Sequence, residues 1–270
     1  MISSLSGSPR ASTYLPNQDP MASPSLHALL LLSDSALPLG SFAFSSGLES
    51  FLGHKGVSNT HRSSSAATKL AAAETFLEQS VINLASTALP YVLSAFHNPS
   101  TLEDLDNDFD ASTPCTVARR ASIAQGRALL QIWERALIPA AAAGEARECV
   151  SSFAIKLKSN VVDDFGLQLQ AHFAPLFGAV CAALSLSVHD TAYLFLLNHA
   201  KAVLSAAVRA SVIGPYQSQA LLADSRLQEC INACIEREKL SRVDQAAVTV
   251  PTMDLWMGRH ELLYSRIFNS

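Results

Sequence analysis

Apolar residues recur at helical spacing through almost the whole chain, and this periodicity constrains the fold more than any other feature of the sequence. No run alternates between apolar and polar residues within turn signals, and no fixed-length repeat is visible. A representative stretch is 66–88, where one helix face carries Leu70, Leu77, Val81, Leu84 and Ala88. The sequence therefore predicts an all-α fold, a single compact helical bundle of about eight to ten helices.

Proline, glycine and serine mark where the expected helices begin and end. Ser23 and Pro24 form an N-cap and first-turn pair. Gly214 and Pro215 end another helix, because a C-terminal glycine is commonly followed by proline. Pro90 is expected to interrupt the helix that begins near residue 66. The expected helices are 24–36, 45–53, 66–88 with a continuation to 97, 101–110, 114–137, 146–157, 175–186, 187–213, 221–235 and a last segment from residue 251.

The chain is expected to divide into three parts. Residues 1–24 are rich in serine and proline and are predicted to be a disordered tail. Residues 25–243 are predicted to form the helical domain. Residues 244–270 form a C-terminal tail that carries Trp256, Leu263, Tyr264 and Phe268. A projecting segment cannot bury all of these side chains by itself, so we expect the tail to become ordered when it binds a partner.

The composition indicates a large core and a sparsely charged surface. Hydrophobic residues make up 49% of the chain and charged residues 16%, so we expect a partner to cover part of the apolar surface. The formal net charge of −4 gives no electrostatic basis for binding nucleic acid. Five cysteines spread along the chain do not suggest a disulfide framework. With no basic patch before an apolar run at the N-terminus, a reducing, cytoplasmic location is expected.

A membrane-spanning segment is the alternative that the stretch 164–190 raises. No formal charge occurs between Asp164 and Asp190, a span long enough to cross a bilayer. However, Gln170, His172 and Pro175 lie within it, and its polar groups cluster in its first half. A buried core helix is the better interpretation, and we expect no membrane contact.

The motifs of common enzyme classes are missing from the sequence. No glycine-rich loop ends in Gly-Lys-Ser or Gly-Lys-Thr, so nucleotide hydrolysis by this chain is not expected. There is no G-x-S-x-G turn, and His260-Glu261 lacks the second histidine of a zinc-protease helix. The sequence predicts that the chain is not an enzyme and that it holds no stable cofactor.

Two pairs of residues are weak candidates for metal binding. Cys230 and Cys234 are four positions apart on an expected helix, where two thiols face the same way and suit a soft metal. His54 and His61 flank a polar loop and could be transient nickel ligands. The simpler interpretations are buried cysteines and solvated histidines, because a closed site needs more ligands.

Five separated blocks of the sequence resemble the urease accessory protein UreF family. The segment 29–49, LLLLSDSALPLGSFAFSSGLE, closely resembles the N-terminal signature of the family. The segments RRASIAQGRALL (119–130) and QAHFAPLFG (170–178) are similar to a central helix of eukaryotic members and to a His-x-x-Pro-x-x-Gly motif. Further similarity lies at 208–219 and in the C-terminal MGRHELLYSRIFNS (257–270).

This resemblance implies a scaffold role in metal delivery. Members of the family are all-helical homodimers that bind UreD, also called UreH, and the GTPase UreG. The assembly passes nickel, its cargo, from UreG towards apo-urease, and GTP is bound by UreG. The family member itself is thought to assist or gate the GTPase.

The resemblance also assigns candidate partner-binding residues at both ends of the sequence. In the tail these are Tyr264, Arg266 and Phe268, and we expect Arg266 to anchor the tail by hydrogen bonds to backbone carbonyl groups near 38–42.

The N-terminal signature supplies the other candidates. Pro38 and Gly40 would fix the shape of the loop. Phe42 stands where some members have tyrosine, so the hydroxyl of those members is missing here. Glu49 would face the polar side of its helix, where it is either an interface acid that pairs with a base of a partner or a solvated surface acid.

Two other functions stay open at this point. One is a helical enzyme with an apolar pocket built around His172 and Glu49, although a histidine in an apolar segment is more simply a core residue bonded to the backbone. The other is direct nickel binding by the chain itself, through histidine or cysteine.

Overall fold

The computed structural model describes residues 23–55, 65–160, 162, 166–264 and 266–269. These residues form eleven α-helices and no strand, apart from a single bridge between Val162 and Gln168. The helices are α1 (Pro24–Ser33), α2 (Leu48–His54), α3 (Ala66–His97), α4 (Leu102–Ser112), α5 (Thr116–Ile132), α6 (Glu145–Ser159), α7 (Phe173–Ala183), α8 (Val188–Arg209), α9 (Pro215–Ala223), α10 (Ser225–Glu238) and α11 (Pro251–His260). The predicted all-α class is confirmed; the disordered tail predicted for 1–24 lies almost wholly outside the described residues.

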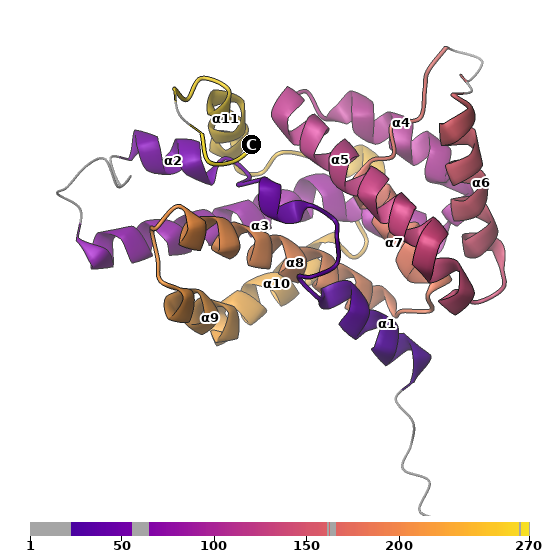
Figure 1. Ribbon diagram of the computed structural model, residues 1–270, viewed down its shortest axis with the longest axis horizontal. Helices are drawn as coiled ribbons and strands as arrows, with labels where there is room; N and C mark the ends of the chain where they lie inside the picture. Colours follow the sequence, from indigo (N-terminus) through magenta and orange to yellow (C-terminus); the bar gives the residue numbers. More distant parts are fainter. Residues whose placement is uncertain (1–22, 56–64, 161, 163–165, 265, 270) are drawn as a thin grey trace, which may run out of the picture.

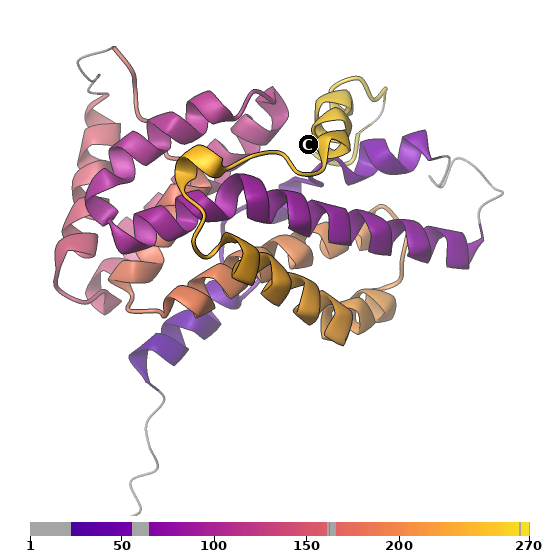
Figure 2. The same ribbon diagram turned by 180° about the vertical axis from the view of Figure 1, so that it is seen from behind.

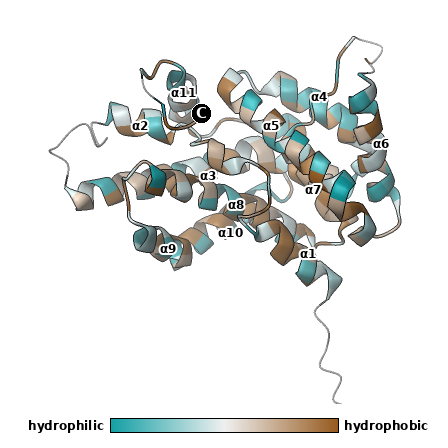
Figure 3. Ribbon diagram, in the orientation of Figure 1, coloured by the Kyte–Doolittle hydropathy of each residue, from teal (hydrophilic) through white to brown (hydrophobic). Residues whose placement is uncertain are grey.

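Helix α3 is the spine of the bundle. It is 32 residues long, and Figures 1 and 2 show it running across the molecule with α8 and α10 beside it. Helices α4 to α7 gather at one end, whereas α2 and α11 lie together at the other. In Figure 3 most helices carry both hydrophilic and hydrophobic colours, as expected when each turns one face inward.

The interruption predicted at Pro90 does not occur, because α3 continues through it. Proline has no N–H to donate to the carbonyl group four residues earlier, which is that of Ser86. Here the Ser86 oxygen accepts a hydrogen bond from the amide of Ala247 at 3.2 Å instead. The Ser86 and Thr249 hydroxyls, 2.7 Å apart, add a second link. Pro90 therefore leaves the Ser86 carbonyl oxygen free to bind the segment before α11, which attaches that segment to α3.

Helix α7 is the buried centre of the α4–α7 end, and it is only 11 residues long. It packs against α3, α5 and α6. Gly178 lies so close to α3 that an added Cβ would meet the Val92 oxygen at 2.0 Å. Of the stretch 164–190 that raised the membrane alternative, this short helix is the apolar part, so the interpretation as a core helix is confirmed.

One helix in the described ranges, α8, is long and apolar enough to cross a membrane by length and composition alone. Within its most apolar window 56% is buried inside the protein, as in a core helix of a bundle. It also holds α1, because Asn198 and Lys201 donate to the Leu32 and Ser33 carbonyl oxygens at 3.0 and 2.8 Å. These side chains satisfy carbonyl groups that a helix C-terminus leaves free.

Two expected helices are divided in the structure. The helix expected to carry both Leu221 and Ile235 splits at Asp224, whose carboxylate accepts from the Arg226 amide and caps α10. The helix expected over 114–137 ends at Ile132 and continues as a π-helical turn, Trp133–Leu137. Pro139 follows that turn and has no N–H to donate to the Arg135 carbonyl group four residues earlier, and the chain continues there as a 3-10 turn, Ile138–Ala140.

Candidate functional site

The C-terminal tail folds back onto the N-terminal signature. The Glu49 carboxylate on α2 accepts the backbone amide of Ile267 at 2.9 Å and that of Phe268 at 3.4 Å. The Asn269 amide donates to the Ala43 carbonyl oxygen at 2.8 Å. Figure 1 shows the C-terminus beside α2 and α11. The structure thus brings together candidates from both ends of the sequence, and Glu49 is neither free nor fully solvated.

Helix α11 brings the tail to this position by packing on α2. Gly47 at the start of α2 has a φ of +86°, and an added Cβ would lie 2.8 Å from the Met257 backbone nitrogen. The Trp256 ring packs edge-on against Phe51, with centroids 5.7 Å apart, and lies 5.0 Å from the His54 ring. Glycine is therefore needed at residue 47 both for its backbone conformation and for the close approach of α11.

His260 connects α11 to the tail from inside. Its side chain is fully buried, and its Nε2 lies 3.1 Å from the Phe268 carbonyl oxygen. A carbonyl oxygen can only accept, so Nε2 carries the hydrogen and donates. The Nδ1 atom lies 3.9 Å from a Glu49 carboxylate oxygen. The bond to His260 and the bonds to Glu49 hold both sides of Phe268, whose side chain is buried.

Arginines on the outside complete the attachment of the tail. Arg120 on α5 donates to the Glu261 carboxylate and, at 3.0 Å, to the Asn269 carbonyl oxygen. Arg266 donates to the other Glu261 oxygen at 2.9 Å. Hydrogen bonds from Arg120 and then Arg266 lower the pKa of Glu261. Arg266 was expected to contact carbonyl groups near 38–42, but it donates to Glu261, and the Asn269 amide contacts the neighbouring Ala43 carbonyl oxygen.

Arg209, at the end of α8, is a residue of this surface for which sequence reasoning predicted no role. Its guanidinium carbon lies 4.5 Å from the Phe268 ring centroid and 5.9 Å from that of Phe42. Among the described residues no carboxylate pairs with Arg209, and burial lowers its pKa. The sequence signal that could have identified Arg209 is its position in the block 208–219, which resembles the UreF family and also contains Ile213-Gly214-Pro215.

Large apolar side chains remain exposed around this attachment. Phe42 is 64% exposed, Ile267 is 62% exposed and Tyr264 is fully exposed. Gly40, with a φ of +71°, permits the turn that carries Phe42 outward, and Pro38 precedes it in the same loop. We define the partner surface as the exposed side chains Phe42, Arg209, Leu262, Tyr264, Arg266 and Ile267. Their role in binding a partner stays a prediction.

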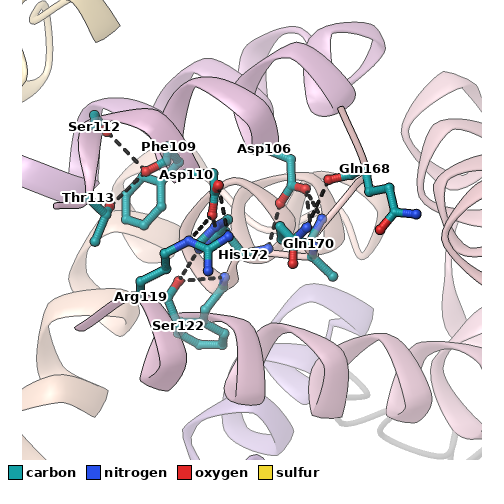
Figure 4. Close-up of polar contacts among 12 residues, drawn as sticks. Asp106, Phe109, Asp110, Ser112, Thr113, Arg119, Ser122, Gln168, Gln170 and His172 are labelled. Carbon is teal, nitrogen blue, oxygen red and sulfur yellow. Dashed lines mark hydrogen bonds and ion pairs between the residues drawn. The ribbon is translucent and has the colours of Figure 1, made fainter. Parts of the chain in front are cut away.

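A second polar cluster lies inside the protein, around His172 between α4, α5 and the start of α7 (Figure 4). The His172 ring is fully buried, with Nδ1 3.1 Å from Ser122 Oγ and Nε2 2.8 Å from an Asp110 oxygen. Arg119 donates twice to the same Asp110 carboxylate. These partners are side chains, not the backbone groups expected from the sequence.

Asp106 fixes the loop that leads to His172. Asp106 is 1% exposed, and its carboxylate accepts hydrogen bonds from three backbone amides, those of Gln170, Ala171 and His172, at 2.7, 3.1 and 2.6 Å. Ala171 has a φ of +64°, a left-handed conformation that alanine rarely adopts. Asp106 therefore faces inward from α4, where it holds a strained turn.

Both nitrogen atoms of the His172 ring have hydrogen-bond partners. The Phe173 amide donates to Ser122 Oγ at 3.1 Å, so the hydroxyl hydrogen is available for His172 Nδ1. The Asp110 carboxylate only accepts, so His172 Nε2 donates to it. Burial raises the pKa of Asp110, but hydrogen bonds from Arg119 and His172 outweigh burial and lower it. Both ring nitrogens are therefore engaged in hydrogen bonds inside the protein.

A cavity of about 290 Å³ lies under the 32–46 loop, between α3, α5, α8 and α11. His199 lines it, and the Nε2 atom of this histidine has no hydrogen-bond partner in the described part of the chain. Neither His172 nor Glu49 lines the cavity, and among the described residues the two have no hydrogen-bond partner in common. His172 and Glu49 therefore do not form the apolar pocket that the helical-enzyme hypothesis requires.

The metal candidates do not assemble into a larger site. No group of three or more histidine, cysteine or acidic side chains that could hold a metal ion occurs within the described ranges. His54 is exposed and packs on Trp256, and His61 lies outside the described residues. Cys234 is buried and Cys230 is half-buried on α10.

A family model and several known proteins that are similar to this chain all point to the same family. The sequence model of the UreF family matches residues 67–226. A "Uncharacterized urease accessory protein UreF-like" from Schizosaccharomyces pombe is 35% identical over 244 residues, covering 90% of this chain and 97% of that protein. Urease accessory protein F from Oryza sativa subsp. indica is 29% identical, covering 88% and 82%. UreF from Actinobacillus pleuropneumoniae serotype 5b is 26% identical, covering 91% and 99%.

Proposed function

The chain belongs to the UreF family of urease accessory proteins, and from this membership we propose that it is a scaffold for inserting nickel into apo-urease. In this proposal it binds UreD (UreH) and the GTPase UreG, acts as a homodimer in the cytoplasm, and couples GTP hydrolysis by UreG to nickel transfer. Nickel is the cargo of the assembly, and this chain catalyses no reaction.

The observation that carries the proposal is the partner surface assembled from both ends of the sequence. It combines exposed aromatic and aliphatic side chains with Arg209, which has no carboxylate partner among the described residues. Aromatic residues with arginine are typical of the few side chains that dominate binding energy at protein interfaces. The exposed side chains of Tyr264 and Phe42 contribute little to the stability of the isolated chain, but they would contribute binding energy if a partner covered them.

The docked tail adds to this argument. A tail that became ordered only on binding would lose conformational entropy at that step. Here Glu49, His260 and Arg120 already hold the tail against the bundle. Preorganisation lowers the free-energy cost of association, so this surface is suited to repeated binding and release.

The internal polar cluster supports a role without catalysis. Both His172 nitrogens and the Ser122 hydroxyl are engaged in hydrogen bonds that fix the start of α7. The cluster therefore serves the shape of the bundle, and the chemistry of the assembly belongs to its partners.

The proposal is tested by co-expressing the chain with UreD, UreG and apo-urease and measuring the recovered complex and urease activity. We expect Phe42→Ala with Tyr264→Ala to weaken recovery by about tenfold, because two anchor side chains are lost. Tyr216→Ala is the control, since Tyr216 is also highly exposed but lies on α9, outside the partner surface. Full recovery and activation with the double variant would contradict the proposal.

A further inference from the structure

Helix α10 carries two cysteines that the proposed function does not use. Cys230 and Cys234 are one turn apart on the side of α10 that packs towards α3, and Figure 2 shows α10 lying along α3. Cys234 is 2% exposed, whereas Cys230 is half-buried. Residues four apart on a helix have their Cβ atoms about 5–6 Å apart. The two sulfurs therefore face one another across a single turn, one inside the protein and one at its edge.

The two thiols interact, and a cation lies next to them. Hydrogen bonding from Cys230 lowers the pKa of Cys234, and the same bond together with burial raises the pKa of Cys230. Arg237 acts on both sulfurs and is held by Glu238 at 2.6 Å. A negative charge on this pair is therefore partly balanced by a fixed guanidinium group.

The surroundings decide which metal fits. A closed zinc site needs four ligands, but within the described ranges no third histidine, cysteine or acid completes the pair. Glu238 is already occupied by Arg237, and Glu78 on α3 is exposed at the outer edge. Two thiolates without further ligands suit a soft monovalent cation, because thiolate ligands select copper(I) over harder metals.

We propose that Cys230 and Cys234 bind one copper(I) ion between their two sulfurs. Binding forms two Cu–S bonds and releases two thiol protons, and no electron is transferred. The product carries one negative charge, which the neighbouring Arg237 guanidinium balances in part. Half-buried Cys230 provides access from solvent beside Glu78, while Cys234 and its neighbours Ile231 and Ile235 keep water from the inner side. This site is independent of the urease role.

The test is a titration of the reduced full-length chain with copper(I) under anaerobic conditions, against a chromophoric copper(I) chelator. We expect wild type to withhold one equivalent, and Cys234→Ser and Cys230→Ser each to weaken binding at least tenfold. Cys149→Ser is the matched control, because Cys149 is a half-buried cysteine of α6 outside this pair. Far-UV circular dichroism checks that each variant is folded.

Two further measurements on the wild-type chain keep the test independent of the variants. Alkylation followed by mass spectrometry should show half-buried Cys230 protected by one equivalent of copper(I), while Cys149 still reacts. The affinity should rise with pH as two protons are released. No withheld copper, equal binding by the Cys230→Ser/Cys234→Ser double variant, or protection of Cys149 instead would overturn the proposal.

Discussion

His172 shows how one residue can look catalytic in a sequence and be structural in the protein. Replacing it with alanine would leave Ser122 and Asp110 without their shared partner and open a void between α4, α5 and α7. We expect His172→Ala to lower the free energy of unfolding by about 3 kcal/mol, from the cavity and the unpaired polar groups together. Urea denaturation measures the loss.

The control for this variant is His189→Ala, because His189 is exposed at the start of α8. Its effect should stay within about 0.5 kcal/mol. A loss for His172→Ala no larger than that of the control would mean that the cluster does not hold the start of α7.

His199 makes the stability of the protein depend on pH. Burial lowers the pKa of its imidazole from about 6.5 to about 4. The folded chain then binds this proton less readily than the unfolded chain, so stability rises with pH between these two values. Stabilisation present above about 6.5 should be lost progressively as the pH falls towards about 4.

This dependence is measured by urea unfolding at neutral pH and at about pH 5, a value inside the window set by the two pKa values. His199→Gln should lose less stability on acidification than wild type, because glutamine does not titrate. His189→Gln should keep the wild-type loss, since His189 is exposed. An unchanged loss in His199→Gln would show that another group is responsible.

At the scale of elements, the crossing of α7 with α3 depends on Gly178. An added Cβ would meet the Val92 carbonyl oxygen at 2.0 Å, and that oxygen belongs to the backbone of α3, which cannot move away easily. We expect Gly178→Ala to destabilise the protein by about 3 kcal/mol through overpacking. Thermal or urea unfolding reports the change.

Gly258 in α11 is the matched glycine, since nothing lies within 4 Å of the position of its Cβ. Gly258→Ala should therefore stabilise the protein by about 0.5–1 kcal/mol, because alanine is the better helix former. If both substitutions had the same sign, close approach would not explain the glycine at 178.

Helix boundaries could be predicted from the sequence where a nearby residue, such as a capping serine, determines them. Ser23 caps α1 as expected, because a cap acts within its own turn, and Ser187 caps α8 in the same way. Pro90 misled the prediction, since the amide that satisfies Ser86 comes from Ala247, far along the chain. Asp224 was missed as a cap because it lies inside an apolar pattern that reads as one continuous helix.

Individual residues of the candidate site could be predicted from the sequence, but the contacts between them could not. The residues Phe42, Glu49 and Arg266 were visible in two family-like blocks, but their contacts depend on tertiary packing. Only the fold shows that Glu49 accepts the tail amides and that Arg209 reaches Phe268 from α8. Residues that act through long-range contacts leave no periodic signal in a single sequence.

At the scale of the whole molecule, the attachment of the tail to Glu49 should control how well the chain binds its proposed partners. Glu49→Ala removes the acceptor of the Ile267 and Phe268 amides. We expect the tail to detach more often, so that trypsin cleaves faster after Arg259 and Arg266. Recovery of the complex with UreD and UreG should fall by about tenfold, because the ordering cost returns at binding.

Tyr264→Ala separates the two contributions to binding, because it removes an exposed anchor and leaves the attachment at Glu49 in place. Its tail should resist trypsin as well as wild type does, while its complex is weakened. Glu49→Ala should instead change both properties together, with the helical content unchanged by circular dichroism. A Glu49→Ala chain with a fast-cleaved tail and normal complex recovery would mean that partners bind the released tail equally well, and that the docked arrangement does not prepare the surface for them.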